Sequence, residues 1–419
     1  MHFTEIRQHL PPLREQAVIR NRWLLKRLDT VVPELMACHG FDCWIVAARE
    51  YNEDPTIMTL LPEPAMSARR RTILAFVRAA DGAVERLTFD RYGFGDFYQR
   101  MWEPERESQW DCLSRVIAVR APQQIGIHVS ETFPFADGLT HSEYMQLSVA
   151  LGPALMRRVR SAENLAVGWL ERRIPEELSV YPRLAAIAHA IIARAYSRHV
   201  ISPGNTTTDD VVWWMRQTMH DHGLRAWFHP TVDIQARGQR YDHRAQPRKL
   251  ILPGDLLHCD MGFVALGLCT DHQQHAYVRY NGERHAPDGL RAAFRRTNRL
   301  QDIHTEEMVT GRSGNEILRR ALERARREGL RPSIYSHPLG YHGHAAGPTI
   351  GLWDMQDGVP GKGDYPLYDS TCYSIELNGR SDVPEWDNQE VRIALEENAV
   401  FRNGRTEYLD GRQTELFLI

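Results

Sequence analysis

Apolar and polar positions follow two different periods along the chain, which separate expected helices from expected strands. Over 13–38 apolar residues recur at helical spacing and Gly40 follows, which predicts a helix with a glycine just past its end. Mostly apolar runs at 41–48, 72–77 and 125–129 predict strands, with polar or helical segments between them. This alternation predicts a small sheet covered by helices over about the first 160 residues.

The pattern changes beyond this region. A charged helical segment over 156–173 is of the kind that connects two compact units. Apolar spacing then predicts a long helix over 175–199 and two amphipathic helices over 290–327. We therefore expect two domains, one formed by residues 1–165 and one by residues 166–419.

The segment 253–278 predicts a β-hairpin, because two apolar runs flank a short connection. Asp260 and Asp271 lie in it, eleven positions apart. With the turn centred between Ala265 and Leu266, the two aspartates face each other with Cβ atoms about 5 Å apart, where like charges repel. A divalent cation would turn this repulsion into chelation. A shifted register, with both aspartates solvated beside the turn, is the simpler alternative for two aspartates taken alone.

Three of the 19 histidines, His337, His342 and His344, lie within eight residues of each other in a glycine-rich segment. Glycine permits the tight turns that aim an imidazole into a cleft. A single histidine is usually a polar residue satisfied within the fold. Three histidines beside small residues instead favour a metal site or an acid–base site.

Two glutamates are embedded in strand-like runs. Glu376 follows the apolar run 372–375, and Glu396 ends the strand predicted over 391–395. A carboxylate in or beside a core strand is costly unless it is paired or coordinated. With Asp260 and Asp271 these residues make four carboxylates, whose four negative charges two divalent cations would neutralise. A histidine would bring the candidate ligands to five.

Composition narrows the functional classes. The 419 residues carry a formal net charge of −3, which argues against a general affinity for nucleic acid or anionic membranes. The six cysteines include no CxxC pair, so neither a disulfide framework nor a zinc ribbon is indicated. The first residues lack the apolar core of a signal peptide, and no apolar run is long enough to cross a bilayer. We therefore expect a cytoplasmic protein.

These motifs resemble those of the pita-bread metallopeptidases, which include methionine aminopeptidase, aminopeptidase P, prolidase and the metal-free creatinase. The family's hairpin pattern is matched by Gly254-Asp255-Leu256 with Asp260, Gly262 and Asp271, and its Gly-His-x-x-Gly pattern by 343–347. Its first glutamate strand is matched by Ile375-Glu376. Its second is matched less neatly, by Val391-Arg392-Ile393 before Glu396. The resemblance is specific from Pro175 onward and general over the first 160 residues. It implies an α+β pita-bread catalytic domain preceded by a smaller α/β creatinase-like domain.

The resemblance also implies a set of site residues. Two divalent metal ions would be held by Asp260, Asp271, His344, Glu376 and Glu396. His243, seventeen residues before the first aspartate, stands where a family histidine contacts substrate. Glu376 would act as the proton acceptor. The predominance of carboxylates favours manganese, with cobalt, zinc and iron as alternatives. A homodimer is also implied.

The sequence departs from the family at one histidine. The family places a second histidine seven residues after its metal-binding one, and Gly351 occupies that position after His344. His337 or His342 is therefore expected to supply the missing imidazole. His342 is also an alternative to His344 as the ligand, and Glu397 is an alternative last ligand.

The implied reaction is hydrolysis of a peptide bond near a free N-terminus. The front domain favours an X-Pro substrate, either a dipeptide or a short peptide. Two alternatives stay open. One is an enzyme of the same fold that acts on a small non-peptide substrate, which the departure at Gly351 favours, and the other is a non-catalytic peptide-binding module.

Overall fold

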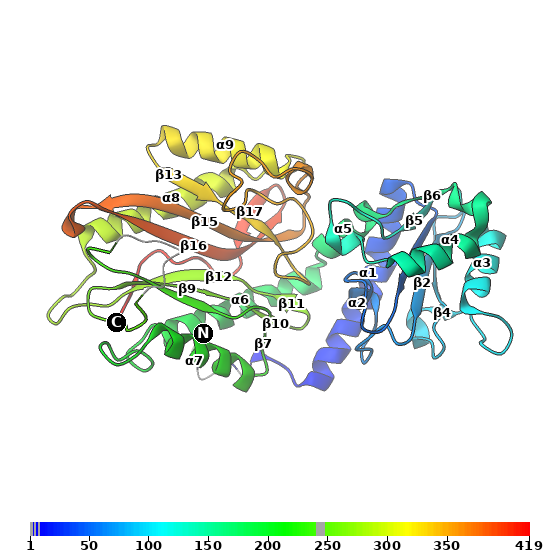
Figure 1. The fold of residues 1–419 in the computed structure, drawn as a ribbon, viewed down its shortest axis with the longest axis horizontal. Coiled ribbons are helices and arrows are strands. Elements are labelled where there is room, and N and C mark those ends of the chain that lie inside the picture. Colours follow the sequence, from blue (N-terminus) through cyan, green and yellow to red (C-terminus); the bar gives the residue numbers. More distant parts are fainter. Residues whose placement is uncertain (1–2, 4–5, 7–8, 240–247) are drawn as a thin grey trace. The chain divides into compact units, whose positions relative to one another are not determined.

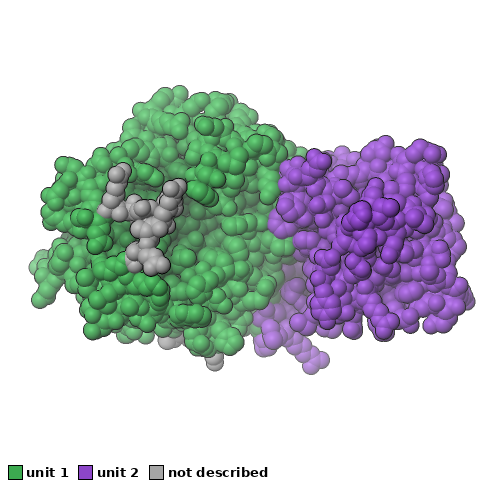
Figure 2. Space-filling view, viewed as in Figure 1, with its two compact units in different colours: residues 1–11, 175–419 green, residues 12–174 purple. Residues whose placement is uncertain are grey.

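The computed structural model describes Phe3, Ile6 and residues 9–239 and 248–419. The chain divides into two compact units, one formed by residues 12–174 and the other by residues 1–11 and 175–419 (Figure 2). The division lies nine residues after the expected one at 165/166, because α5 (Glu163–Glu171) belongs to the first unit. It packs there against α1 (Leu13–His39), whose Arg27 guanidinium lies 4.3 Å from the centre of the Trp169 ring.

The first unit is a mixed sheet with helices. Its strands run in the order β4-β3-β2-β1-β5-β6, with β1 antiparallel to β2 and parallel to β5. The strands are β1 (Cys43–Ala48), β2 (Thr72–Arg78), β3 (Val84–Thr88), β4 (Gln99–Arg100), β5 (Ile125–Ile127) and β6 (Val159–Ser161). The remaining helices are α2 (Ile57–Leu60), α3 (Gln109–Arg120) and α4 (His141–Met156). Gly40 ends α1 in the left-handed conformation, with φ of 70°, as its position predicts.

The second unit is built on a larger, mainly antiparallel sheet in the order β13-β15-β16-β12-β9-β8, with β14, β17 and β18 paired at its sides. These strands are β8 (Thr231–Gln235), β9 (Leu256–Met261), β12 (His272–Tyr277), β13 (Arg331–Ile334), β14 (His337–Leu339), β15 (Thr371–Val383), β16 (Gln389–Arg402), β17 (Arg405–Tyr408) and β18 (Phe417–Leu418). A small second sheet contains β7 (Arg225–Ala226), β10 (Phe263–Ala265) and β11 (Leu268–Cys269).

Two helix pairs accompany the large sheet. They are α6 (Pro175–Ala195) with α7 (Thr208–Asp221), and α8 (Asp288–Glu307) with α9 (Gly314–Arg327) (Figure 1). The second pair packs on β15 and β16 through an apolar cluster that includes Leu300, Ile303, Ile317, Ile375 and Phe401. Among the described helices, none combines the length and the apolar character that crossing a membrane requires.

The hairpin register differs from the expected one. Asp260 pairs with Gln273 rather than with Asp271, an offset of two residues. The turn lies one residue later than predicted, because Leu266 and Gly267 both have positive φ, 52° and 79°, and form a two-residue connection. Since an offset of two keeps side chains on the same face, the two aspartates still point to one side of the sheet.

A buried histidine in α8 predicts an acid-sensitive stability. His304 is fully buried, neither ring nitrogen has a hydrogen-bond partner, and burial lowers its pKa to about 4. The unfolded chain takes up this proton near pH 6.5, so the folded state loses stability as the pH falls from about 6.5 to about 4. Between pH 7 and pH 5, we expect the free energy of unfolding to fall by about 2 kcal/mol less in His304→Gln than in the wild type.

Urea unfolding at the two pH values measures this difference. His199→Gln, which changes an exposed histidine of the same unit, is the matched control and should behave as the wild type. An equal loss of stability in wild type and His304→Gln would contradict the account.

Candidate metal centre

The acidic residues form a row across four neighbouring strands. Asp260 of β9 pairs with Gln273 of β12, Gln273 pairs with Glu396 of β16, and Glu396 pairs with Glu376 of β15. Strand pairing therefore brings together residues more than 100 positions apart in the sequence. Ligand oxygens of Asp260, Asp271 and Glu396 lie within 4.8 Å of one another.

Gln273 holds the two glutamates of this row. Its Nε2 donates to Glu376 Oε1 at 2.9 Å and to Glu396 Oε2 at 2.7 Å, while its Oε1 lies 2.9 Å from Nε2 of His258. The other oxygen of Glu396 accepts a 2.6 Å hydrogen bond from Ser374. Both glutamates are therefore fixed in orientation by neutral donors, which satisfy their hydrogen bonds without cancelling their charge.

His337 is the imidazole among these carboxylates. It opens β14, and its Nε2 lies 3.4 Å from Glu396 Oε1, 3.7 Å from Asp271 Oδ2 and 3.9 Å from Glu376 Oε2. The pairing of β14 with β15, in which His337 faces Ser374, sets this position. Although three carboxylates surround it, its Nε2 makes no hydrogen bond.

Several atoms of the cluster lack the partners that burial demands. Asp260 Oδ1, Asp271 Oδ1 and His337 Nε2 are buried without a hydrogen bond. A buried polar atom without a partner destabilises the folded state. Burial first, and then the charge of Glu396, raises the pKa of Asp260, Asp271 and Glu376 well above the usual value. Divalent cations would supply both the missing partners and the missing positive charge, so the residues present fit a metal centre.

The other predicted histidines occupy different places. The exposed His344 lies with Asp271 and His337 in a second group of ligand atoms, and its ring centre is 4.7 Å from that of His337. Burial of part of the ring, followed by the charge of His337, lowers the pKa of His344 to about 4. His342 is in no such group among the described residues. His243 lies outside the described residues.

Glu397, the alternative last ligand, points away from this cluster. Its Oε2 lies 2.7 Å from Nε2 of His189, and its Oε1 accepts from Gln274 at 2.9 Å. Because successive strand residues face opposite sides of a sheet, Glu396 and Glu397 cannot both enter the acidic row. The structure therefore places Glu396 in the row.

Two glycines let the segments around the cluster approach closely. A Cβ on Gly262 would stand 2.3 Å from the Thr270 carbonyl oxygen and from Nε1 of Trp227, and a Cβ on Gly343 would stand 2.3 Å from the same indole ring. Trp227 Nε1 donates to the Thr270 carbonyl at 2.9 Å, beside Asp271. The hairpin and the histidine segment thus pack on one tryptophan, which only glycine permits at these two positions.

Sequence reasoning missed Gln273, His258 and Ser374. Each of the three makes a hydrogen bond to a residue of a neighbouring strand, and which residues face each other depends on the register of the sheet. One signal was present: polar residues fill 272–275, a stretch that is fully within a buried strand. Buried amides and imidazoles of this kind need partners, so the stretch indicated a polar network.

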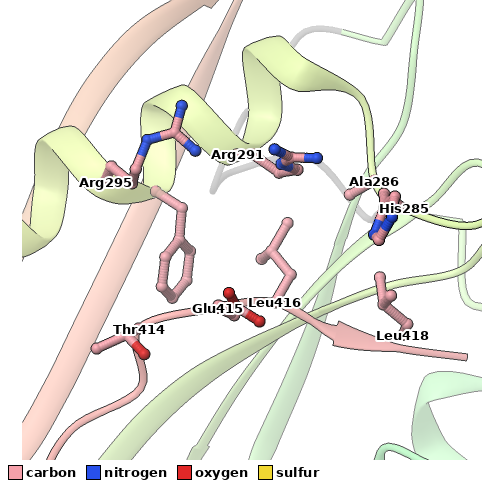
Figure 3. Close-up of a pocket in the computed structure, with 9 residues that line it drawn as sticks. His285, Ala286, Arg291, Arg295, Thr414, Glu415, Leu416 and Leu418 are labelled. Carbon is pink, nitrogen blue, oxygen red and sulfur yellow. The ribbon is translucent and has the colours of Figure 1, made fainter.

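A separate cavity of about 330 Å³ lies between α8 and the C-terminal segment (Figure 3). Arg291 and Arg295 of α8 line it together with Glu415, and no residue of the acidic row does. Residues of both charge signs and apolar residues line this cavity, and we assign it no part in the metal centre.

Comparison with known proteins decides the family. The model of metallopeptidase family M24 matches residues 182–401, more than half of the chain. The chain belongs to metallopeptidase family M24. This membership confirms the resemblance drawn from the motifs, and the matched region of this M24 chain contains every described residue of the acidic row. No curated protein matches the sequence.

Solved structures agree on the two-part fold. An X-Pro aminopeptidase from Thermotoga maritima MSB8 matches with a TM-score of 0.67 and 16% identity, over 92% of this chain and 100% of that one. A Xaa-Pro dipeptidase from Bacillus anthracis matches with 0.64 and 16%, over 94% and 99%. The N-terminal domain of FACT complex subunit SPT16 from chickpea matches with 0.57 and 12%, over 94% and 98%. At these identities the M24 chain shares the fold with them.

The placement of the histidines predicts different effects of their removal. We expect His337→Ala to reduce the manganese bound per chain, because it removes the imidazole nearest three carboxylates. His344→Ala is expected to lose less manganese, since His344 is exposed and, of the four carboxylates, is grouped only with Asp271. Elemental analysis after manganese loading and dialysis measures both, with His342→Ala as the matched control. Loss of manganese in His344→Ala with full retention in His337→Ala would contradict this assignment.

Proposed function

We propose that this M24 chain is a dinuclear-metal peptidase that cleaves a peptide bond near the free N-terminus of X-Pro dipeptides or short X-Pro peptides. The convergence of Asp260, Asp271, Glu376 and Glu396 around His337 carries the proposal. Such crowding of buried acids has no structural benefit by itself, since it raises the cost of their ionisation. The X-Pro preference is supported by the likeness of fold to two proteins named for X-Pro substrates.

The ligand set follows the seven-residue spacing of the family when it starts at His337. His344 stands seven residues after His337, and Gly340 three residues after it. With His337 as the ligand and His344 as the second histidine, the departure at Gly351 disappears. We therefore propose Asp260, Asp271, His337, Glu376 and Glu396 as the ligands of two divalent cations.

Two cations bound here would supply Lewis acidity toward a carbonyl oxygen and would lower the pKa of a water molecule. Manganese suits a set of four carboxylates and one imidazole. Four negative charges and two dications also balance, which removes the repulsion that the chain otherwise carries in this row.

The residues of the chain have distinct roles in the proposed reaction. Glu376 is the most exposed of the glutamates in the row, with 17% of its side chain accessible against 1% for Glu396. Its Oε1 is held by Gln273, so Oε2 is the atom that accepts the proton from water and returns it to the leaving amine. His344 is neutral at pH 7 and donates a hydrogen bond to the developing oxyanion. The same role toward substrate remains a prediction for His243.

A likeness of fold at 12% to 16% identity is shared with a FACT complex domain as well as with two proteins named for X-Pro substrates, so it does not decide between an enzyme and a binding module. Fold alone therefore does not establish catalysis. The ligand set distinguishes the two readings, because a surface that only binds peptide has no need of buried, crowded acids.

Removal of one ligand tests the proposed function. Manganese-loaded wild type is expected to hydrolyse Gly-Pro, Ala-Pro or a longer X-Pro peptide. Asp260→Ala removes a carboxylate shared by the cluster, so we expect bound manganese to fall and kcat/KM to drop by at least about 100-fold. Asp382→Ala, which changes an exposed carboxylate of β15, is the matched control and should keep both.

The substrate panel separates the alternatives. Hydrolysis of creatine in place of the X-Pro substrates would indicate an enzyme for small non-peptide molecules. Peptide binding without hydrolysis by the manganese-loaded chain would indicate a binding module. Full activity of Asp260→Ala would contradict the proposed metal centre.

A further inference from the structure

A second group of metal-ligand atoms lies on the opposite face of the sheet from the acidic row. His189 of α6, His272 of β12 and Glu397 of β16 place their ligand atoms within 4.8 Å of one another. Glu397 Oε2 lies 2.7 Å from His189 Nε2 and 3.9 Å from His272 Nε2. The two imidazole rings meet edge to face, with centres 4.8 Å apart.

Glu397 is held in one orientation. Its Oε1 accepts hydrogen bonds from Nε2 of Gln274 and from the backbone N–H of Gln413, both at 2.9 Å. These two donors leave Oε2 directed at the imidazoles of His189 and His272. A carboxylate fixed through one oxygen presents the other as a single, preoriented ligand atom.

His272 has no partner for its ring nitrogens. It is fully buried, and neither Nδ1 nor Nε2 makes a hydrogen bond. An imidazole offers a metal the lone pair of one ring nitrogen when the proton is on the other. A buried imidazole with both nitrogens unsatisfied costs stability, which points to a missing ligand between it and Glu397.

Asp410 prepares His189 to act as a ligand. Its Oδ2 lies 2.9 Å from Nδ1 of His189, on the other side of the ring from Glu397. An Nδ1–H that is held by a carboxylate leaves the Nε2 lone pair free to bind a metal. Without a cation, Nε2 of His189 must carry a second ring proton and donate it in a hydrogen bond to Glu397.

We propose that His189, His272 and Glu397 bind a further divalent transition-metal ion of the zinc type, with Asp410 orienting His189. Two imidazole nitrogens and one carboxylate oxygen suit zinc, whereas the acidic row suits a harder ion. The charges also balance, since one dication with two neutral imidazoles offsets Glu397 and Asp410. Binding displaces the proton between His189 and Glu397 into solvent.

The geometry needs only small adjustments. Ligand atoms around a tetrahedral zinc ion lie about 3.3 Å apart. Starting from 2.7 Å and 3.9 Å, the contacts of Glu397 with His189 and His272 would each change by about 0.6 Å. A cavity of about 410 Å³, lined by His189, Gln274, Asp410 and Gln413 among others, borders the site on the side of His189, whereas His272 and Glu397 are fully buried behind it.

Zinc content of the full-length chain tests the inference. After loading with zinc chloride and dialysis, we expect three zinc ions per wild-type chain and two in His272→Gln. The Asp260→Ala variant is expected to bind less metal at the acidic row and to keep the zinc ion at His189, His272 and Glu397. Adding His272→Gln to that variant is expected to remove this remaining ion. His304→Gln changes another buried histidine with unpartnered ring nitrogens and should keep the wild-type content. Equal zinc content in wild type and His272→Gln would overturn the inference.

Crystals of the zinc-loaded wild-type chain provide a second measurement that needs no variant. An anomalous-scattering peak between His189, His272 and Glu397 is expected. Zinc at the acidic row without a peak at this site would overturn the inference and leave the proposed function standing. Zinc at this site without zinc at the acidic row would have the reverse meaning.

Discussion

The mutual repulsion of acidic side chains across β9, β12, β16 and β15 determines what else this part of the sheet must hold. Gln273 and Ser374 satisfy hydrogen bonds of Glu376 and Glu396, but neutral donors leave the charge in place. Oδ1 of Asp260, Oδ1 of Asp271 and Nε2 of His337 have no hydrogen-bond partner. Cations are the one kind of partner that resolves both deficits, and the glycine contacts with Trp227 hold the hairpin and the histidine segment close enough to share them.

The alternation of strand residues gives this sheet two polar faces. Asp271 and Glu396 point into the acidic row, and their immediate neighbours His272 and Glu397 point to the face that α6 covers. A metal ion on the second face would therefore lie behind two ligands of the first site, separated from it by the backbone of β12 and β16. A metal ion bound at one face would therefore restrain the strands that carry the ligands of the other face.

Much of this arrangement could be predicted from the sequence, and register explains the rest. The hairpin, the two aspartates and both strand glutamates were found because their types and spacing are local. The partner of Asp260 was missed because the turn position depends on left-handed residues at Leu266 and Gly267. Sequence reasoning weighed only His344 and His342 as the ligand, because both lie beside glycines, and expected His337 at most as a second imidazole. The pairing of β14 with β15, which brings Nε2 of His337 to 3.4 Å from Glu396, is not readable from local spacing.

A calorimetric titration of the metal-free chain with manganese at pH 6, in two buffers of different ionisation enthalpy, tests whether the acidic row binds cations. It yields the ions bound and the protons released for each ion. Because burial and mutual repulsion raise the pKa of Asp260, Asp271 and Glu376, we predict two manganese ions per chain and a net release of protons. Absence of binding, or binding without proton release, would contradict the account.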